Sequence, residues 1–106
     1  MPAPQPNMQQ MLKQAQKMQA QVMAAQAQLV EDRVEGSAGG GLVTAVVSGT
    51  GELVGLQIKP EAVDPDDAET LADLVVAAVR DGQRAAHEHA ESTMGPLTQG
   101  MPGLGF

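Results

Sequence analysis

The chain contains no cysteine, no tryptophan and no tyrosine, and its single phenylalanine is the last of 106 residues. Without cysteine it forms neither a disulfide nor a thiolate metal site, which fits a reducing cytoplasm. Without aromatic side chains, a small domain buries little area per residue, so we expect a dimer to bury more surface than one protomer can. The first residues, MPAPQPN, lack the basic start and apolar run of a signal peptide, and no apolar run approaches the roughly 20 residues of a membrane span. We therefore expect a cytoplasmic protein with no membrane partner.

Few residues are suited to catalysis. The two histidines, His87 and His89, lie close together near the end of a helical pattern, and most serines and threonines fall in predicted turns or strands with no base nearby in the sequence. His87 and Glu91 are four residues apart and share a helix face, but no third ligand lies nearby, so we expect no metal site. We predict a binding protein rather than an enzyme, with no catalytic residues, no cofactor and no small-molecule substrate.

The charge is unevenly distributed along the chain. The formal net charge is −7, which by itself argues against a nucleic-acid partner. Residues 1–30, however, contain Lys13 and Lys17 and no acidic residue, whereas residues 61–69 contain five acidic residues and no basic one. A polyanionic partner can therefore meet the N-terminal segment without meeting the acidic cluster.

The N-terminal third of the chain is predicted to be one long helix. Prolines alternate near the N-terminus, so residues 1–7 are expected to form a flexible lead-in, with Asn7 as the N-cap of a helix that runs to about Val30. Apolar side chains recur at spacings of three and four: Met8, Met11, Ala15, Met18, Val22, Ala25 and Leu29. This stripe favours helix-to-helix packing, as in a coiled coil; the alternative is an adaptable Met-rich surface for variable partners. Lys13 and Lys17 lie one turn apart on the opposite side.

Residues 39–59, GGGLVTAVVSGTGELVGLQIK, are predicted to form a β-hairpin. Its two β-branched-rich runs are separated by Ser48-Gly49-Thr50-Gly51, whose glycines allow the positive φ angles that a tight reversal needs. Upstream, Val34 between polar neighbours fits a short edge strand, and residues 37–41 fit the turn into the hairpin. The glycine run is not a phosphate-binding loop, because no Gly-Lys-Ser/Thr follows it and the next element is a strand.

A second long helix is predicted from about Pro65 to Ser92 or beyond. Asp64 is expected to be its N-cap, with Pro65 at the first helical position and further acids near the positive end of the helix dipole. The rest of the chain, residues 95–106, repeats glycine and proline and is expected to form a disordered tail.

Arg80 and Arg84 lie one turn apart on the polar side of this second helix. Two interpretations of the pair remain open. The arginines form local ion pairs, Arg84 with Asp81 or Glu88, or both guanidinium groups face one way and contact phosphates.

Four segments in this order, KQAQKMQAQ, GGGLVTAVVSG, IKPEAVDPDD and LADLVVAAVRDG, resemble the YbaB/EbfC family of nucleoid-associated proteins. The resemblance covers residues 8–94, which we take as one DNA-binding domain. It implies an α+β fold, in which an α-β-β-β-α protomer carries a three-stranded antiparallel sheet flanked by two long helices. It also implies a homodimer whose long helices project like the arms of tweezers.

For function, the resemblance implies binding to duplex DNA in the bacterial nucleoid, with effects on chromosome organisation and gene expression. The family's DNA contacts are attributed to the helical arms, and the basic residues at matching positions here are Lys13, Lys17, Arg80 and Arg84. Because the folded part has no aromatic side chain for base stacking, what remains is phosphate contact with little sequence preference and strong salt dependence. The alternative function is a protein-interaction adaptor that uses the Met-, Ala- and Gln-rich helices and does not bind DNA. Convergence of the four basic side chains on one face favours DNA binding, whereas interleaved acids favour the adaptor.

Overall fold

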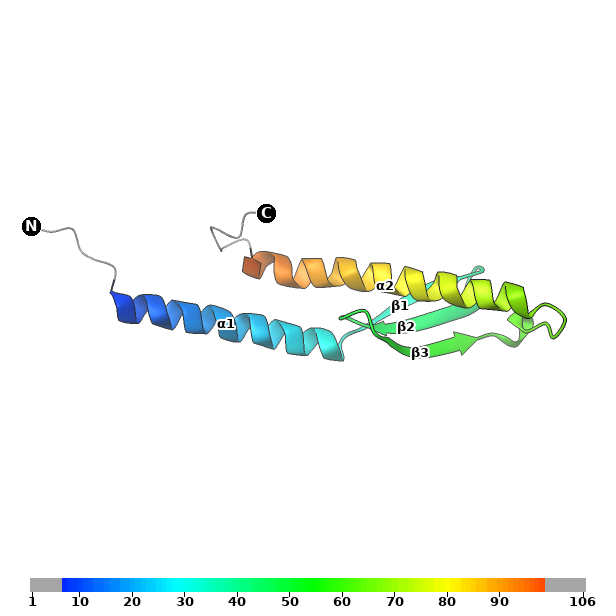
Figure 1. Cartoon of the computed structure of the whole chain (residues 1–106), viewed down its shortest axis with the longest axis horizontal. Helices are drawn as coiled ribbons and strands as arrows, with labels where there is room; N and C mark the ends of the chain where they lie inside the picture. Colours follow the sequence, from blue (N-terminus) through cyan, green and yellow to red (C-terminus); the bar gives the residue numbers. More distant parts are fainter. Residues whose placement is uncertain (1–6, 99–106) are drawn as a thin grey trace, which may run out of the picture.

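The computed structural model describes residues 7–98 and shows a helix, a three-stranded sheet and a second helix (Figure 1). In chain order the elements are α1 (Met8–Glu31), β1 (Arg33–Ala38), β2 (Val43–Ser48), β3 (Leu53–Ile58), the 3-10 helix η1 (Pro60–Ala62) and α2 (Ala68–Thr98). The strands form one antiparallel sheet in the order β1-β2-β3. This arrangement confirms the predicted α-β-β-β-α fold.

The first helix begins at its predicted N-cap and ends at Glu31, one residue beyond the predicted Val30. The Asn7 side chain accepts a hydrogen bond from the Gln9 backbone N–H (3.0 Å), which confirms Asn7 as the N-cap. At the other end, Asp32 adopts an extended conformation, and its N–H donates to the Gln28 carbonyl. Asp32 is therefore the single residue that joins α1 to β1.

The second helix, α2, packs across one face of the sheet, over β1 and β2 (Figure 1). Side chains alternate along a strand, and Val43, Ala45 and Val47 of β2 point toward the helix and are fully buried. They form the core with Ala78 and Ala86 of α2. Because all of these side chains are small, the helix lies close to the sheet.

Two glycines bring the backbones of α2 and β1 into contact. A Cβ atom added to Gly36 would lie 2.0 Å from the Gly82 nitrogen and 2.6 Å from the Ala78 carbonyl oxygen. No side chain fits in that space. The pair therefore fixes where α2 crosses the sheet.

The turns between strands use glycine as the sequence predicts. Gly39, Gly40, Gly41 and Gly51 all have positive φ, between 65° and 95°. The first turn is shorter than predicted, because β1 continues to Ala38.

Strand β3 lies at the edge of the sheet, beyond the area that α2 covers (Figure 1). Its apolar residues Leu53, Leu56 and Ile58 pair with the buried residues of β2 and so share the face on which α2 packs. They nevertheless remain 39–45% exposed. We call these three residues the β3 row.

The predicted start of α2 is wrong by three residues, since the helix begins at Ala68 and not at Pro65. Asp64 accepts hydrogen bonds within a turn, from the N–H groups of Asp66 and Asp67. Asp67 instead caps the helix, because its carboxylate accepts from the Thr70 N–H (3.2 Å) and hydroxyl (2.6 Å). At its other end, α2 continues to Thr98. The rest of the predicted tail and the start of the predicted lead-in lie outside the described residues.

Candidate nucleic-acid interface

The first half of α1 stands apart from the rest of the described chain. Every residue from Met8 to Lys17 is exposed, whereas Leu29, near the other end of the helix, is buried. We call Met8–Lys17 the arm. Figure 1 shows this end of α1 extending away from the sheet.

Lys13 and Lys17 lie on the arm, one helical turn apart. From Met8 to Val30 the helix contains no acidic residue. Within residues 7–98, no carboxylate lies within ion-pair distance of either lysine. The two ammonium groups therefore carry the uncompensated positive charge of α1.

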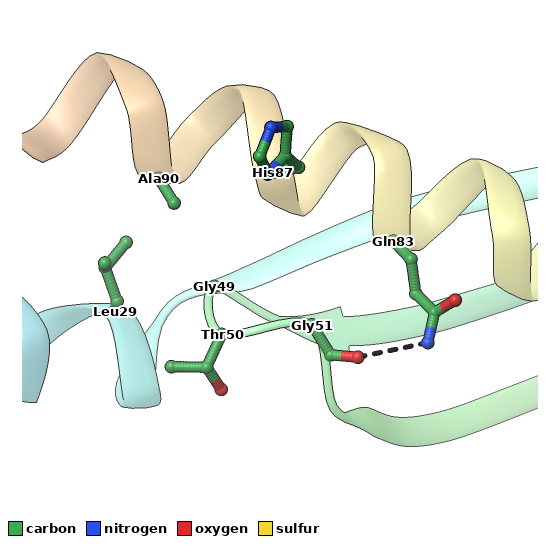
Figure 2. A pocket seen from close by; sticks show the side chains of 7 residues that line it. All are labelled: Leu29, Gly49, Thr50, Gly51, Gln83, His87 and Ala90. Carbon is green, nitrogen blue, oxygen red and sulfur yellow. Dashed lines mark hydrogen bonds between the residues drawn. The ribbon is translucent and has the colours of Figure 1, made fainter. Parts of the chain in front are cut away.

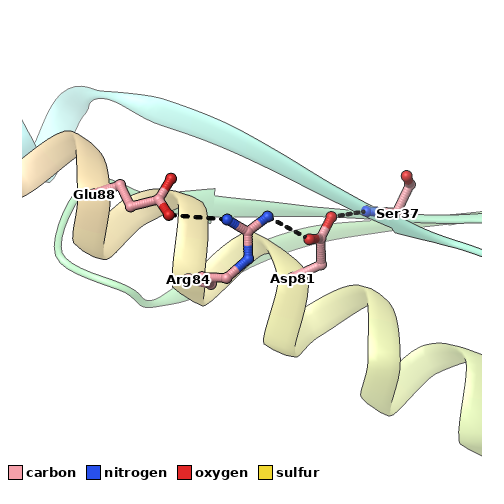
Figure 3. Close-up of polar contacts among 4 residues, drawn as sticks. All are labelled: Ser37, Asp81, Arg84 and Glu88. Carbon is pink, nitrogen blue, oxygen red and sulfur yellow. Dashed lines mark hydrogen bonds and ion pairs between the residues drawn. The ribbon is translucent and has the colours of Figure 1, made fainter.

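Arg84 of α2 is held by two carboxylates (Figure 3). Its guanidinium donates to Asp81 (2.8 Å) and to Glu88 (3.0 Å). These contacts raise the pKa of Arg84, chiefly through the hydrogen bond to Asp81, and the same bond lowers the pKa of Asp81. Of the two interpretations of the arginine pair, local ion pairing is thus confirmed for Arg84.

Arg80 differs from Arg84 in its surroundings. It is exposed on α2, and within the described part of the chain it has no ion-pair partner. Exposed acids nevertheless surround the pair along the helix: Glu69, Asp73, Glu88 and Glu91. On α2, therefore, acids interleave the basic residues, while on α1 they do not.

The lysines and the arginines do not converge within one protomer. Leu29 of α1 and Ala90 of α2 face each other across one cleft (Figure 2). Lys17 lies 12 residues from Leu29, about 18 Å along α1, and Arg84 lies 6 residues from Ala90, about 9 Å along α2 in the opposite direction. One protomer therefore presents two separate basic sites, at the arm and over the sheet.

Histidines contribute one contact that the sequence predicts and one that it does not. His87 and Glu91 form the expected pair on one helix face (3.0 Å). His89 lies among the apolar positions of α2, and its Nε2 contacts the Asp32 carboxylate at 2.7 Å. The two residues are 57 positions apart, so no local spacing predicts their contact. Among residues 7–98 there is no cluster of three or more His, Asp or Glu side chains able to hold a metal ion.

The two edges of the sheet differ in their protection. On β1, the Ser37 N–H donates to the Asp81 carboxylate (3.0 Å, Figure 3), and the side chains of Arg33, Glu35 and Ser37 are polar and exposed. On the edge strand β3, the face toward α2 carries the exposed apolar β3 row. Polar and capped edges resist pairing with another chain, whereas apolar edges favour it.

The structure therefore defines a small α+β protein. The arm contains no acidic residue and projects from the sheet and α2, which together with the segments that join them we call the body and which contain most of the acidic residues. No helix within residues 7–98 combines the length and apolar character that crossing a bilayer requires. Four of the protein's basic side chains lie on the two long helices: Lys13, Lys17, Arg80 and Arg84.

The chain belongs to the YbaB/EbfC DNA-binding family, whose model matches residues 4–101. It is 63% identical to a nucleoid-associated protein of Saccharopolyspora erythraea, with 99% of this chain and 96% of the relative covered. It is 57% identical to a nucleoid-associated protein of Streptomyces griseus, with 95% of this chain and 89% of the relative covered. An uncharacterized protein of Helicobacter pylori, solved by crystallography, has the same fold, with a TM-score of 0.73 at 22% identity over 88% of this chain and 98% of that chain. The predicted family resemblance is thereby confirmed.

Proposed function

We propose that this protein binds duplex DNA as a homodimer in the bacterial nucleoid and so affects chromosome organisation and gene expression. The observation that carries the proposal is the arm, Met8–Lys17, which contains two exposed lysines and no acidic residue. Membership of a DNA-binding family, and relatives named nucleoid-associated proteins, support the same partner.

The contacts in this proposal are made to phosphates. Lys13 and Lys17 on the arm are the main contributors, because their ammonium groups are uncompensated. Arg80 adds a weaker contact on α2, and Arg84 the weakest, since its guanidinium already bonds two carboxylates. Phosphate contacts carry no base information, so binding has little sequence preference and weakens steeply with salt.

A homodimer gives the protein two arms. We propose that the partner's copy covers the β3 row, because this edge is apolar while the β1 edge is polar and capped by Asp81. Among its described residues, a single protomer buries only six apolar side chains, which is a small core for a stable domain. Doubling the arms doubles the number of phosphate contacts and compensates for the small number of basic residues per chain.

A protein-interaction adaptor is the second candidate. Exposed apolar side chains gather near the start of α1, at Met8, Met11 and Leu12. The acids around Arg80 and Arg84 favour this role for α2. The adaptor role does not need Lys13 or Lys17, whereas DNA binding does. Variants of these two lysines therefore distinguish the two functions.

The test is a titration of a short fluorescent duplex, followed by anisotropy at several salt concentrations. We expect binding at low salt that is independent of duplex sequence. In the double variant Lys13→Gln/Lys17→Gln, the slope of log affinity against log salt should fall by about 2 to 4, since each phosphate that a lysine neutralises contributes about 0.9 and the dimer has one or two arms on the duplex.

The matched control is Lys13→Arg/Lys17→Arg, which keeps both charges and should keep the slope. Equal affinities for the Gln and Arg variants would remove the arm from the interface. No binding by the unmodified protein at low salt would leave the adaptor as the function.

A further inference from the structure

Asp32 lies at the centre of the junction between α1 and the body of the protein. The Asp32 carbonyl accepts hydrogen bonds from the Gly49 N–H (3.1 Å) and from the Arg33 guanidinium (2.9 Å). Its carboxylate accepts from the Gln28 amide (2.9 Å) and contacts His89 Nε2 (2.7 Å). One residue therefore links the end of α1, the β2–β3 turn and α2.

Apart from this residue, the junction is loosely packed. A cleft of about 370 Å³ separates the end of α1 from α2 and the β2–β3 turn, lined by Leu29, Gly49, Thr50, Gly51, Gln83, His87 and Ala90 (Figure 2). Leu29 is the one buried side chain of α1. Three more apolar side chains of α1, Met18, Val22 and Ala25, are half-buried. The apolar packing of α1 is therefore thin beyond Leu29, so polar contacts at the junction help to set the direction of the helix.

We infer that His89 and Asp32 form a latch that fixes the direction of α1 relative to α2, and that protonation of the imidazole tightens it. The contact joins the C-terminal end of α1 directly to α2, and it is the only side-chain ion pair between these segments in residues 7–98. The arm ends at Lys17, 15 residues before Asp32, so a small rotation at this residue moves its lysines by many ångströms. Under the proposed DNA binding, on which this consequence rests, His89 is a positioning residue for Lys13 and Lys17.

The expected pH dependence follows from the groups at the contact. The contact is an ion pair when the His89 imidazole is protonated and a hydrogen bond when the imidazole is neutral. The hydrogen bond from His89, and next that from Gln28, lowers the pKa of Asp32, which therefore keeps its charge down to acidic pH. Arg33 is the other charged group that bears on this carboxylate. The latch should thus be tightest when His89 is protonated and Asp32 is ionised.

The neighbouring charged groups on α2 are engaged elsewhere. His87 pairs with Glu91, and Glu88 pairs with Arg84. His87 therefore provides a matched control: a histidine two residues away, on the same helix, with no ion pair to α1 or Asp32.

The test measures the direction of α1 without DNA. The chain has no cysteine, so the exposed positions in Gln10→Cys and Ala77→Cys take spin labels uniquely. By helical rise the two labels are about 50 Å apart, within reach of double electron–electron resonance. Labelled chains are mixed with a large excess of unlabelled chains, so that distances within one protomer dominate.

We define the latched fraction as the share of chains in the narrow distance peak. At about pH 6 we expect a narrower distance distribution than at about pH 8, with the ratio of latched to unlatched chains changing by about twofold to fivefold, as befits a partly exposed pair. His89→Gln keeps a polar side chain that does not titrate, and should remove the pH dependence. His87→Gln should leave it intact. Circular dichroism confirms that each variant is folded.

Distributions that do not change with pH, or that change equally in His89→Gln and His87→Gln, would overturn the latch. Duplex affinity measured on the same samples separates the two proposals. A latch that responds to pH in a protein that binds no duplex supports the latch and rejects DNA binding. A duplex affinity that follows the latched fraction supports both.

Discussion

In the body of the protein, formed by the sheet and α2, backbones touch and buried side chains fill the space between them. On the arm, by contrast, every side chain from Met8 to Lys17 is exposed. The body contains Gly36 against Gly82, where even a methyl group does not fit, whereas α1 is held near its far end by Leu29 and Asp32. Stability is therefore concentrated in the body, and the charges proposed to bind DNA are carried where substitutions have little effect on folding.

The largest effect is expected from Gly36→Ala, which would place a Cβ 2.0 Å from the Gly82 nitrogen. Because both contacting groups are backbone, the helix must move off the sheet, at a cost of about 3 kcal/mol in the free energy of unfolding. Urea unfolding followed by circular dichroism measures the change.

Two controls test whether the effect belongs to the body contact. Gly55→Ala, in the same sheet, meets only Val46 at 3.8 Å and should change stability by less than about 1 kcal/mol. Met11→Gln, on the arm, should stay within about 0.5 kcal/mol of the unmodified protein. A Gly36→Ala protein as stable as these two would remove the distinction between body and arm.

The next largest effect concerns the two sheet edges. Leu56→Lys places a charge in the β3 row and should separate the proposed dimer. Light scattering after gel filtration should then give one chain mass, 10.9 kDa, in place of twice that value.

Ser37→Lys is the matched control for the opposite edge, with the same added charge at an exposed position of β1. It should leave the assembly intact. If both lysine variants dissociate, or neither does, the β3 row is not the dimer contact.

A smaller effect is expected at the start of α2, as a function of pH. Hydrogen bonds from the Thr70 hydroxyl, and next from its N–H, lower the pKa of Asp67. A carboxylate with a lowered pKa in the folded state contributes stability above the ordinary carboxyl pKa, and that contribution is lost as pH falls through the folded value. The melting temperature should therefore fall in acid by less in Asp67→Asn than in the unmodified protein, since asparagine also caps a helix and does not titrate.

Asp73→Asn controls for the loss of one negative charge on the same helix. Its melting temperature should follow that of the unmodified protein through the acid range. A parallel acid response in Asp67→Asn would show that the cap does not contribute to the pH dependence.

The sequence predicts the features that depend on neighbouring residues, and it does not predict contacts between residues far apart in the chain. Spacing and caps predict both helices, and the glycines predict both turns, because these depend on neighbouring residues. The sequence predicts Asp64 as the cap of α2, but hydrogen bonds from Thr70 make Asp67 the cap. Alternation predicts β3 as a strand but does not predict that α2 stops short of it. The contact of His89 with Asp32 joins residues far apart in the chain, and no periodicity carries that information.

The smallest effect sharpens the comparison within the body itself, at the arginine pair. Arg80→Gln removes an uncompensated charge, whereas Arg84→Gln removes one that Asp81 and Glu88 already neutralise. An arginine that neutralises one phosphate contributes about 0.9 to the salt slope, so a Gln variant of that arginine lowers the slope by this amount. We expect a measurable decrease for Arg80→Gln and almost none for Arg84→Gln, because Arg84 must leave two carboxylates before it can bind a phosphate. Equal decreases in the salt slope for the two variants would mean that DNA displaces Asp81 and Glu88 from Arg84. Both arginines of the body would then contact phosphates, as the arm lysines are proposed to do.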